Sequence, residues 1–336
     1  MLKAWTALIC AIVLAAAAVV PAQQPPDFRS FLEDDLNWVV IGDPGNPAFE
    51  GGAQGQLKGR GGIDYRFRLT RTEITVRQWF QFVQAFAPYY EGTYGQSYGL
   101  TGDFIYIAGP LNDPDSYHME EGVKNLPANQ NWRMAARYCN WLHNNKERTR
   151  EAFAKGTYDT STFTENKDGT YNDQRTRSPG ARYWIPSLDE WLKGVYYDRT
   201  LNHGHGGWWW HPGSSDEPLE AGFPWEHGQT NGSLFAGPPP PIEAIEVGAY
   251  PWIRSPWGLL DASGGMREWT EEFGNINHSQ RITKGSSFFS DGFSYQYEDR
   301  ILTLMPSFAW GTAMEGLRLG SAVPGVQYQP VLWDDN

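Results

Sequence analysis

Two acidic residues flank a glycine turn in the last third of the chain. The segment SPWGLLDASGGMREWTEE contains Asp261 and Glu268, with Gly264 and Gly265 between them. Calcium prefers six to eight hard oxygen ligands that combine carboxylates with backbone carbonyls, and glycine lets the chain fold tightly around an ion. The pattern therefore predicts a calcium site at this turn. The alternative is a glycine turn whose two acids are solvated and bind no ion.

Histidines and tryptophans make up most of the segment HGHGGWWWHP. The imidazoles of His203, His205 and His211 suit iron, copper or zinc, but glycine spacing without a carboxylate or a helical scaffold favours a solvated loop. The same segment holds three adjacent tryptophans, Trp208, Trp209 and Trp210. Successive side chains of an extended segment alternate, so these rings cannot all be buried on one side. We therefore expect at least one to stay exposed at the rim of a ligand groove.

The chain contains two cysteines, Cys10 and Cys139. Cys10 lies in the apolar amino-terminal segment, so a processed chain keeps one thiol and forms no internal disulfide. Cys139 falls on the apolar face of a predicted helix, which favours a small buried hydrophobe. Nucleophilic cysteines need a partly exposed, electropositive setting, so the sequence predicts no thiol chemistry at this position.

The amino terminus has the regions of a secretory signal peptide. Lys3 provides the positive charge, residues 7–20 form an apolar run, and small residues precede a cleavage point after residue 22. The apolar run is shorter than the ~20 residues that a membrane crossing needs, and no later segment supplies one. We therefore expect residues 1–22 to be removed during export to the periplasm or the extracellular space.

Composition points to a compact, loop-rich protein. Aromatic residues make up 15% of the 336 residues, and the chain has 37 glycines and 23 prolines. The formal net charge of −12 and the absence of a basic run argue against nucleic-acid binding, which uses basic patches. We expect a short lead-in over residues 23–37 and one domain over residues 38–336.

Apolar periodicity predicts few strands and helices. Strands are expected at residues 38–41 and 63–69, the second from alternation of apolar and polar side chains. Helices are expected at residues 76–86, 132–142 and 188–195, where apolar residues recur at spacings of three and four. The residues expected to cap their amino termini are Thr75, Asn131 and Ser187.

Six ordered segments resemble the formylglycine-generating enzyme domain, also called the sulfatase-modifying factor family. They are RLTRTEITVRQWFQF, NLPANQNWRMAARYCNWL, RYWIPSLDEWLKG, FPWEHGQTNGS, SPWGLLDASGGMREWTEE and the closing pair KGSSF and GLRLG. The upstream IGDPGNPAFEGG further resembles a subgroup of exported bacterial members. These segments are distributed over roughly residues 38–322, nearly the whole processed chain, and their order makes the resemblance specific.

The resemblance implies a single α+β domain similar to the C-type lectin fold, with short twisted sheets, few helices and much irregular loop. It also implies a structural calcium ion, with Asp261 and Glu268 as side-chain ligands and the carbonyls of Gly264 and Met266 as backbone ligands. A second calcium ion of the family would use Asn231. The segment GPPPPIEA lacks the aspartate expected for that ion, so we expect the second site to be weaker.

The sequence departs from the family where the enzymes hold copper. Family enzymes oxidise a substrate cysteine with O2 through a copper ion bound by two cysteines, and the resemblance places these positions at Ser290 and Tyr295. A hydroxyl and a phenol cannot replace two thiolates, because soft sulfur selects Cu(I). We therefore expect neither copper binding nor formylglycine synthesis.

Two classes of function remain open. In the first, the chain is a non-catalytic binding or interaction module that holds a peptide, protein or glycan in the family's former substrate groove. The residues expected along this groove are Trp208, Trp209, Trp210, Ser290 and Tyr295. In the second, it is an oxidoreductase of the formylglycine-generating enzyme and sulfoxide synthase superfamily with a remodelled metal site, in which histidines or Tyr295 replace the cysteines. We favour the first, because fold does not fix function and the missing copper site outweighs the surviving scaffold. The stretch from Gln23 to Arg60 is also too short for the helical domain that supplies the histidines of sulfoxide synthases.

Overall fold

The computed structural model describes residues 36–51, 57–234, 245–310 and 315–324. The predicted signal peptide over residues 1–22 and most of the lead-in over residues 23–37 lie outside these ranges. Within the described ranges, no helix has both the length and the apolar composition that a membrane crossing needs.

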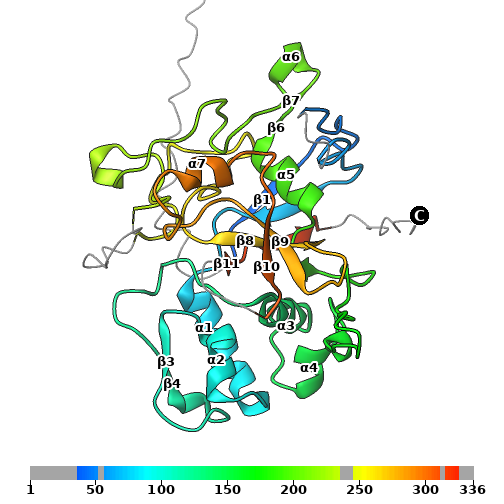
Figure 1. Cartoon of the computed structure of the whole chain (residues 1–336), viewed down its shortest axis with the longest axis vertical. Coiled ribbons are helices and arrows are strands. Elements are labelled where there is room, and N and C mark those ends of the chain that lie inside the picture. Colours follow the sequence, from blue (N-terminus) through cyan, green and yellow to red (C-terminus); the bar gives the residue numbers. More distant parts are fainter. Residues whose placement is uncertain (1–35, 52–56, 235–244, 311–314, 325–336) are drawn as a thin grey trace, which may run out of the picture.

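Two four-stranded sheets form the centre of the domain (Figure 1). The first is antiparallel, in the order β1 (Trp38–Ile41), β2 (Phe67–Thr70), β12 (Gly320–Ala322) and β5 (Tyr183–Trp184). The second has the order β10 (Met305–Phe308), β9 (Gln280–Lys284), β8 (Arg267–Phe273) and β11 (Glu315–Gly316), with β11 parallel to β8. Two ribbons complete the strands, β3 (Ile105–Ile107) with β4 (Tyr117–Met119), and β6 (Tyr197–Asp198) with β7 (Gly207–Trp208).

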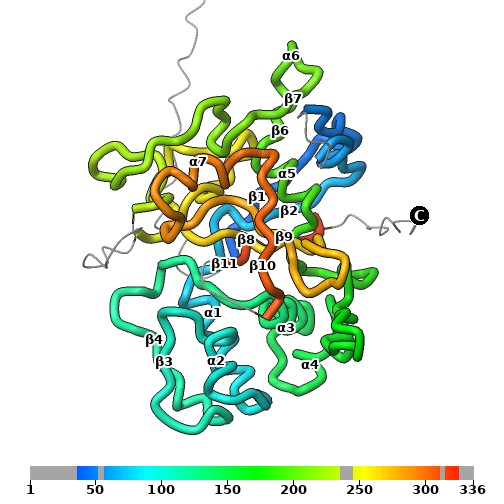
Figure 2. Tube along the Cα trace, viewed as in Figure 1, coloured from blue at the N-terminus to red at the C-terminus, as the bar shows by residue number. Residues whose placement is uncertain are grey.

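Helices lie on both sides of these sheets. The α-helices of the described ranges are α1 (Val76–Phe86), α2 (Tyr94–Thr101), α3 (Trp132–His143), α4 (Arg150–Ala154), α5 (Leu188–Tyr196), α6 (Leu201–Gly204) and α7 (Ser294–Glu298). Short 3-10 helices occur at Ala87–Tyr89, Pro114–Ser116, Thr160–Thr162 and Pro224–Glu226. Figure 2 shows that the chain builds the lower half with α1 to α4 and then returns through the sheets to build the upper half with α5 to α7.

The three predicted helices are confirmed, and their caps form as the sequence indicates. Thr75 and Ser187 each make a full capping box, and the Asn131 side chain accepts a hydrogen bond from the Met134 N–H. Cys139, in α3, is fully buried, as its place on the apolar helix face predicts. The predicted α+β class, with short sheets and much loop in a single domain, is confirmed.

The second predicted strand is shorter than expected. Residues 38–41 form β1 as predicted, but β2 starts only at Phe67. The preceding segment is held by Asn46 instead, whose Oδ1 accepts from the Ile63 N–H at 3.0 Å and whose Nδ2 donates to the Gly61 carbonyl at 3.0 Å. These bonds replace a β ladder, because an asparagine side chain can satisfy backbone groups directly. The result is a fixed loop beside the sheet.

Candidate functional site

The glycine turn is packed tightly between polar side chains. Gly264 and Gly265 have φ angles of +81° and +60°, in the left-handed region that glycine tolerates. A Cβ atom on Gly264 would lie 2.0 Å from Asn231 Oδ1, and one on Gly265 would lie 2.2 Å from Glu73 Oε2. Both glycines are therefore required by backbone conformation and by space, because neither neighbouring polar group leaves room for a methyl.

Three consecutive backbone N–H groups of this turn are bound by side-chain oxygens. Ser286 Oγ accepts from Gly264 at 2.9 Å, Asn231 Oδ1 accepts from Gly265 at 2.7 Å, and Glu73 Oε1 accepts from Met266 at 2.8 Å. Asn231, expected at a second calcium ion, thus directs its amide oxygen to the turn. Glu73 was missed by the sequence analysis, because no local pattern marks a residue that binds 193 positions away.

Glu268 is fully engaged by protein groups. The Arg318 guanidinium donates to both of its carboxylate oxygens, at 2.7 and 2.9 Å, and Trp191 Nε1 donates to Oε2 at 2.7 Å. Arg318 is fully buried and also donates to the carbonyls of Thr70, Arg71 and Leu260. This bidentate, charge-assisted pair fixes Glu268 within the core.

Asp261 and Glu73 supply the carboxylate oxygens that remain at the turn. Asp261 accepts one bond from the Gly248 N–H at 2.6 Å, and burial raises its pKa to about 6. Burial, together with the charges of Glu268 and Asp261, raises the pKa of Glu73 well above its usual range. Glu73 Oε2 is buried without a hydrogen-bond partner among the described residues.

The donor set therefore fits calcium in part. The Glu73 carboxylate oxygen without a partner and the nearby Asp261 carboxylate are hard donors of the type that calcium prefers. The Glu268 carboxylate is instead paired with the Arg318 guanidinium. Across the described ranges, no three His, Cys, Asp or Glu side chains are arranged so that they could hold a metal ion.

The tryptophan segment has one exposed ring. Trp210 is 39% exposed, in agreement with the expectation that the three rings cannot all be buried. Trp208 is half-buried against Phe49, with ring centroids 5.9 Å apart, and the half-buried Trp209 donates from Nε1 to Asp198 at 3.2 Å.

The histidines of this segment lie in different environments. His203 and His205 are exposed, whereas His211 is buried and its pKa is lowered by burial. An exposed pair and a buried third imidazole do not present one common face to a metal ion.

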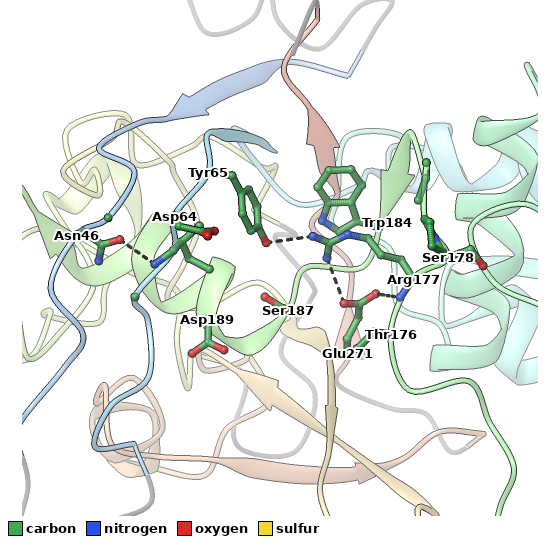
Figure 3. Close-up of a pocket in the computed structure, with 16 residues that line it drawn as sticks. Asn46, Asp64, Tyr65, Thr176, Arg177, Ser178, Trp184, Ser187, Asp189 and Glu271 are labelled. Carbon is green, nitrogen blue, oxygen red and sulfur yellow. Dashed lines mark hydrogen bonds and ion pairs between the residues drawn. The ribbon is translucent and has the colours of Figure 1, made fainter. Parts of the chain in front are cut away.

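A cavity of about 380 Å³ lies between the loop before β2 and the loop before β5 (Figure 3). Its walls come from residues 45–46, 62–65 and 176–181, from Trp184 and the start of α5, and from Glu271 in β8. A smaller cavity of about 140 Å³ shares Thr176, Ser187, Asp189 and Glu271 with it, so the two are adjacent. No sequence pattern indicates this cavity, because its walls come from five separate segments.

A partly buried ion network forms one wall of the cavity. Arg177 donates to Glu190 at 2.8 Å and to Glu271 at 3.2 Å, and its guanidinium lies 4.1 Å from the ring centroid of Trp184. Figure 3 shows Tyr65, Arg177 and Glu271 converging, and Tyr65 also donates to Glu190 at 2.9 Å. Burial raises the pKa of Glu271 to about 7, against the opposing charge of Arg177.

Comparison with known proteins identifies the family. The model of the sulfatase-modifying factor enzyme 1-like domain matches residues 60–303. The chain belongs to this family. No curated protein matches the sequence.

Several solved structures are similar to this sulfatase-modifying factor-like chain. The structure of CarF is 18% identical, with 86% of this chain and 99% of CarF covered at a TM-score of 0.48. Treponema denticola variable protein 1 is 13% identical, with 85% and 95% covered and a TM-score of 0.46. PvdO from Pseudomonas aeruginosa is 13% identical, with 85% and 92% covered and a TM-score of 0.41.

Ser290 and Tyr295, which the sequence analysis expects at the family's copper positions, are interior residues in this sulfatase-modifying factor-like domain. Ser290 is 2% exposed and donates to Glu298 at 2.6 Å. Tyr295 is 4% exposed, and its hydroxyl donates to the Leu219 carbonyl at 3.2 Å. These bonds direct both side chains inward, which corrects the expectation that they line an open groove. The two residues join α7 to neighbouring loops.

Proposed function

We propose that this family member is an exported binding or interaction module without oxidase activity, stabilised by calcium. The observation that carries the proposal is the pair of oxygen side chains at the two positions that the family resemblance assigns to the copper ligands. Ser290 and Tyr295 are buried, and each donates its hydroxyl to a protein acceptor. Neither residue supplies the soft thiolate that Cu(I) requires.

The remaining thiol does not replace the missing pair. Cys139 is fully buried in α3, and burial raises the pKa of its thiol well above the usual range. A thiol in this state is neither a thiolate ligand nor a nucleophile, because both roles need the ionised form. Cys10, the other cysteine, lies in the proposed signal peptide.

Calcium is proposed at the glycine turn. The supporting observations are the orphaned Glu73 Oε2 and the half-buried Asp261 carboxylate, whose pKa is raised by burial. An ion there would draw its ligands from these side chains and from the carbonyls of Gly264 and Met266, with Glu268 kept in its pair with Arg318. Its role would be to neutralise buried carboxylates and to fix a turn that has no disulfide.

The proposed ligand is a peptide, a protein or a glycan. Trp210 supports a binding surface on the α6–β7 side of the domain, because an exposed aromatic ring offers a large contact area at a low cost in side-chain entropy.

Metal analysis combined with an oxidation assay tests the proposal. The processed chain, residues 23–336, is purified, analysed for metals, and incubated with Cu(I), O2 and a cysteine-containing peptide. We expect bound calcium, no tightly bound copper or iron, and no conversion of the peptide cysteine to an aldehyde. A Cys139→Ala variant is the matched control, because it removes the single thiol of that chain. Aldehyde formation, or stoichiometric copper or iron, would refute the proposal.

A further inference from the structure

The cavity beside β5 has walls that are fixed before any ligand binds. Asn46 pins the 61–63 segment through two hydrogen bonds, and the Gly45 N–H donates to the Ile63 carbonyl at 2.8 Å. On the opposite side, the Arg177 N–H donates to Glu271 at 2.7 Å and the Ser178 N–H donates to the Thr157 carbonyl at 2.8 Å. Walls held in this way lose little conformational entropy on binding.

Each guanidinium that lines the two adjacent cavities already contacts a carboxylate. Arg177 is paired with Glu190 and Glu271. Arg60 contacts Asp189 at 2.9 Å and Glu272 at 2.7 Å, and Arg175 lies 3.6 Å from Glu272. An anionic ligand would therefore have to compete with protein carboxylates for each of these cations.

Asp64 differs from the other carboxylates of the cavity. It is exposed at the wall of the larger cavity, and within the described part of the chain it makes no ion pair within 4.0 Å. The buried Lys193 attracts it through space, but the Lys193 ammonium donates to the carbonyls of Asp43 and Ile63. Asp64 thus leaves a negative charge at the cavity that a ligand can neutralise.

We propose that this cavity binds an organic cation, an alkylammonium or alkylguanidinium group, with Asp64 as its counter-charge. The volume of about 380 Å³ lies within the range of small-molecule sites and far exceeds that of a metal ion. The aliphatic stem would pack against Tyr65, Pro179 and Ala181, which line the same cavity. A stacked sugar is disfavoured, because Trp184 is 1% exposed and Arg177 covers one face of its ring.

This inference rests on the proposed binding role and assigns a ligand class to a cavity that Trp210 does not line. The cation has two sources, a free amine or the side chain of a basic residue in a partner peptide. Isothermal titration of the processed chain with agmatine, cadaverine, and the peptides Gly-Arg-Gly and Gly-citrulline-Gly distinguishes them. We expect the cationic probes to bind and the neutral citrulline peptide to bind at least about fivefold more weakly, the effect of losing one partly exposed ion pair. Tighter binding of either the free amines or the arginine peptide identifies the source.

Two variants locate the binding in the cavity. Asp64→Asn keeps the shape and should weaken the cationic probes by about fivefold, whereas Asp291→Asn makes the same change in net charge at an exposed position and should not. Thr176→Trp, at an exposed residue shared by both cavities, should abolish binding by filling the space. Melting curves of the variants confirm that they are folded.

The inference is overturned if no cationic probe binds, if the citrulline peptide binds as tightly as the arginine peptide, or if Asp64→Asn has no effect. These outcomes are separate from failure of the proposed function, which is read from aldehyde formation and from the metal content. A chain with oxidase activity and a cation site would fail the first proposal and pass this one.

Discussion

Removing calcium should destabilise the protein through the buried charges at the glycine turn. Glu73, Asp261 and Glu268 share a single buried guanidinium, that of Arg318. Without a second cation, two carboxyl groups must be protonated or remain charged without a partner, and both alternatives cost folding free energy at neutral pH. A bound calcium ion removes that cost, so ion binding and folding are coupled.

The expected magnitude follows from linkage. With free calcium at about 100 times its dissociation constant, the native state gains about 2.7 kcal/mol. With an unfolding entropy of about 2.1 cal/mol/K per residue, each kcal/mol shifts the midpoint of a domain of about 300 residues by roughly 1.6 °C, so the melting temperature should fall by about 4 °C on chelation. Calorimetry at pH 7.5, with excess calcium and then with excess EGTA, measures this difference directly.

Variants separate an ion site from a turn with buried acids. Asp261→Ala should abolish most of the calcium response, and Glu73→Gln, which keeps the acceptor for the Met266 N–H, should reduce it. Asp291→Ala, at an exposed residue, should leave the response unchanged. The quantity compared is the shift between calcium and EGTA, so a variant that is simply less stable does not mimic the effect. Equal melting curves in calcium and EGTA, for the wild type and for Asp261→Ala alike, would show that the turn binds no calcium ion.

Two further predictions concern the buried charges. Arg318→Met should lower the free energy of unfolding, measured in urea, by about 3 to 5 kcal/mol, because Glu268 loses its ion pair in the core. The additional change Glu268→Gln should restore part of this loss. A loss below about 1 kcal/mol for Arg318→Met would contradict the prediction. Burial raises the pKa of Asp299 to about 7, above its unfolded value, so its contribution to stability is present below pH ~4 and is lost as the pH rises to about 7. In the wild type the free energy of unfolding should therefore fall between pH 4 and 7, and in Asp299→Asn this fall should be smaller by up to ~4 kcal/mol. A pH profile of Asp299→Asn identical to that of the wild type would contradict the prediction.

The elements that the sequence predicted correctly are those with local signals. The caps at Thr75, Asn131 and Ser187 act within three residues of themselves, and the apolar spacing that follows each cap marks one helix face. The apolar run at residues 38–41 formed β1 with the predicted bounds. Such signals are readable because a helix or a short strand is specified largely by neighbours in the chain.

The arrangement of charged groups was not readable in the same way. Glu268 meets Arg318 50 positions later, and Tyr65 meets Glu190 125 positions later, so no window of sequence contains either pair. Burial of Ser290 and Tyr295 also depends on distant partners, since Tyr295 bonds to the carbonyl of Leu219. These contacts are products of the tertiary fold, which a one-dimensional pattern does not encode.

Buried arginines replace disulfides as cross-links in this loop-rich domain. Arg318 connects Glu268, beside the glycine turn, to the carbonyls of Thr70 and Arg71 at the end of β2. Arg281 lies 3.8 Å from the ring centroid of Trp132 and donates to the carbonyls of Gln174 and Arg175. Arg281 therefore anchors the loop that leads into the cavity wall.

The charged groups of the scaffold have ion-pair partners within the protein, whereas a charged group of the candidate binding site has none in the described chain. When both partners of an ion pair are buried, their desolvation occurs during folding, and the pair contributes no binding free energy to a ligand. The pair of Arg318 with Glu268 is of this kind, since both side chains are buried. Asp64 is not, because it faces a preformed cavity while its charge has no ion-pair partner in the described chain. A ligand that supplies the missing positive charge thus adds binding free energy without disturbing the cross-links that hold the loops.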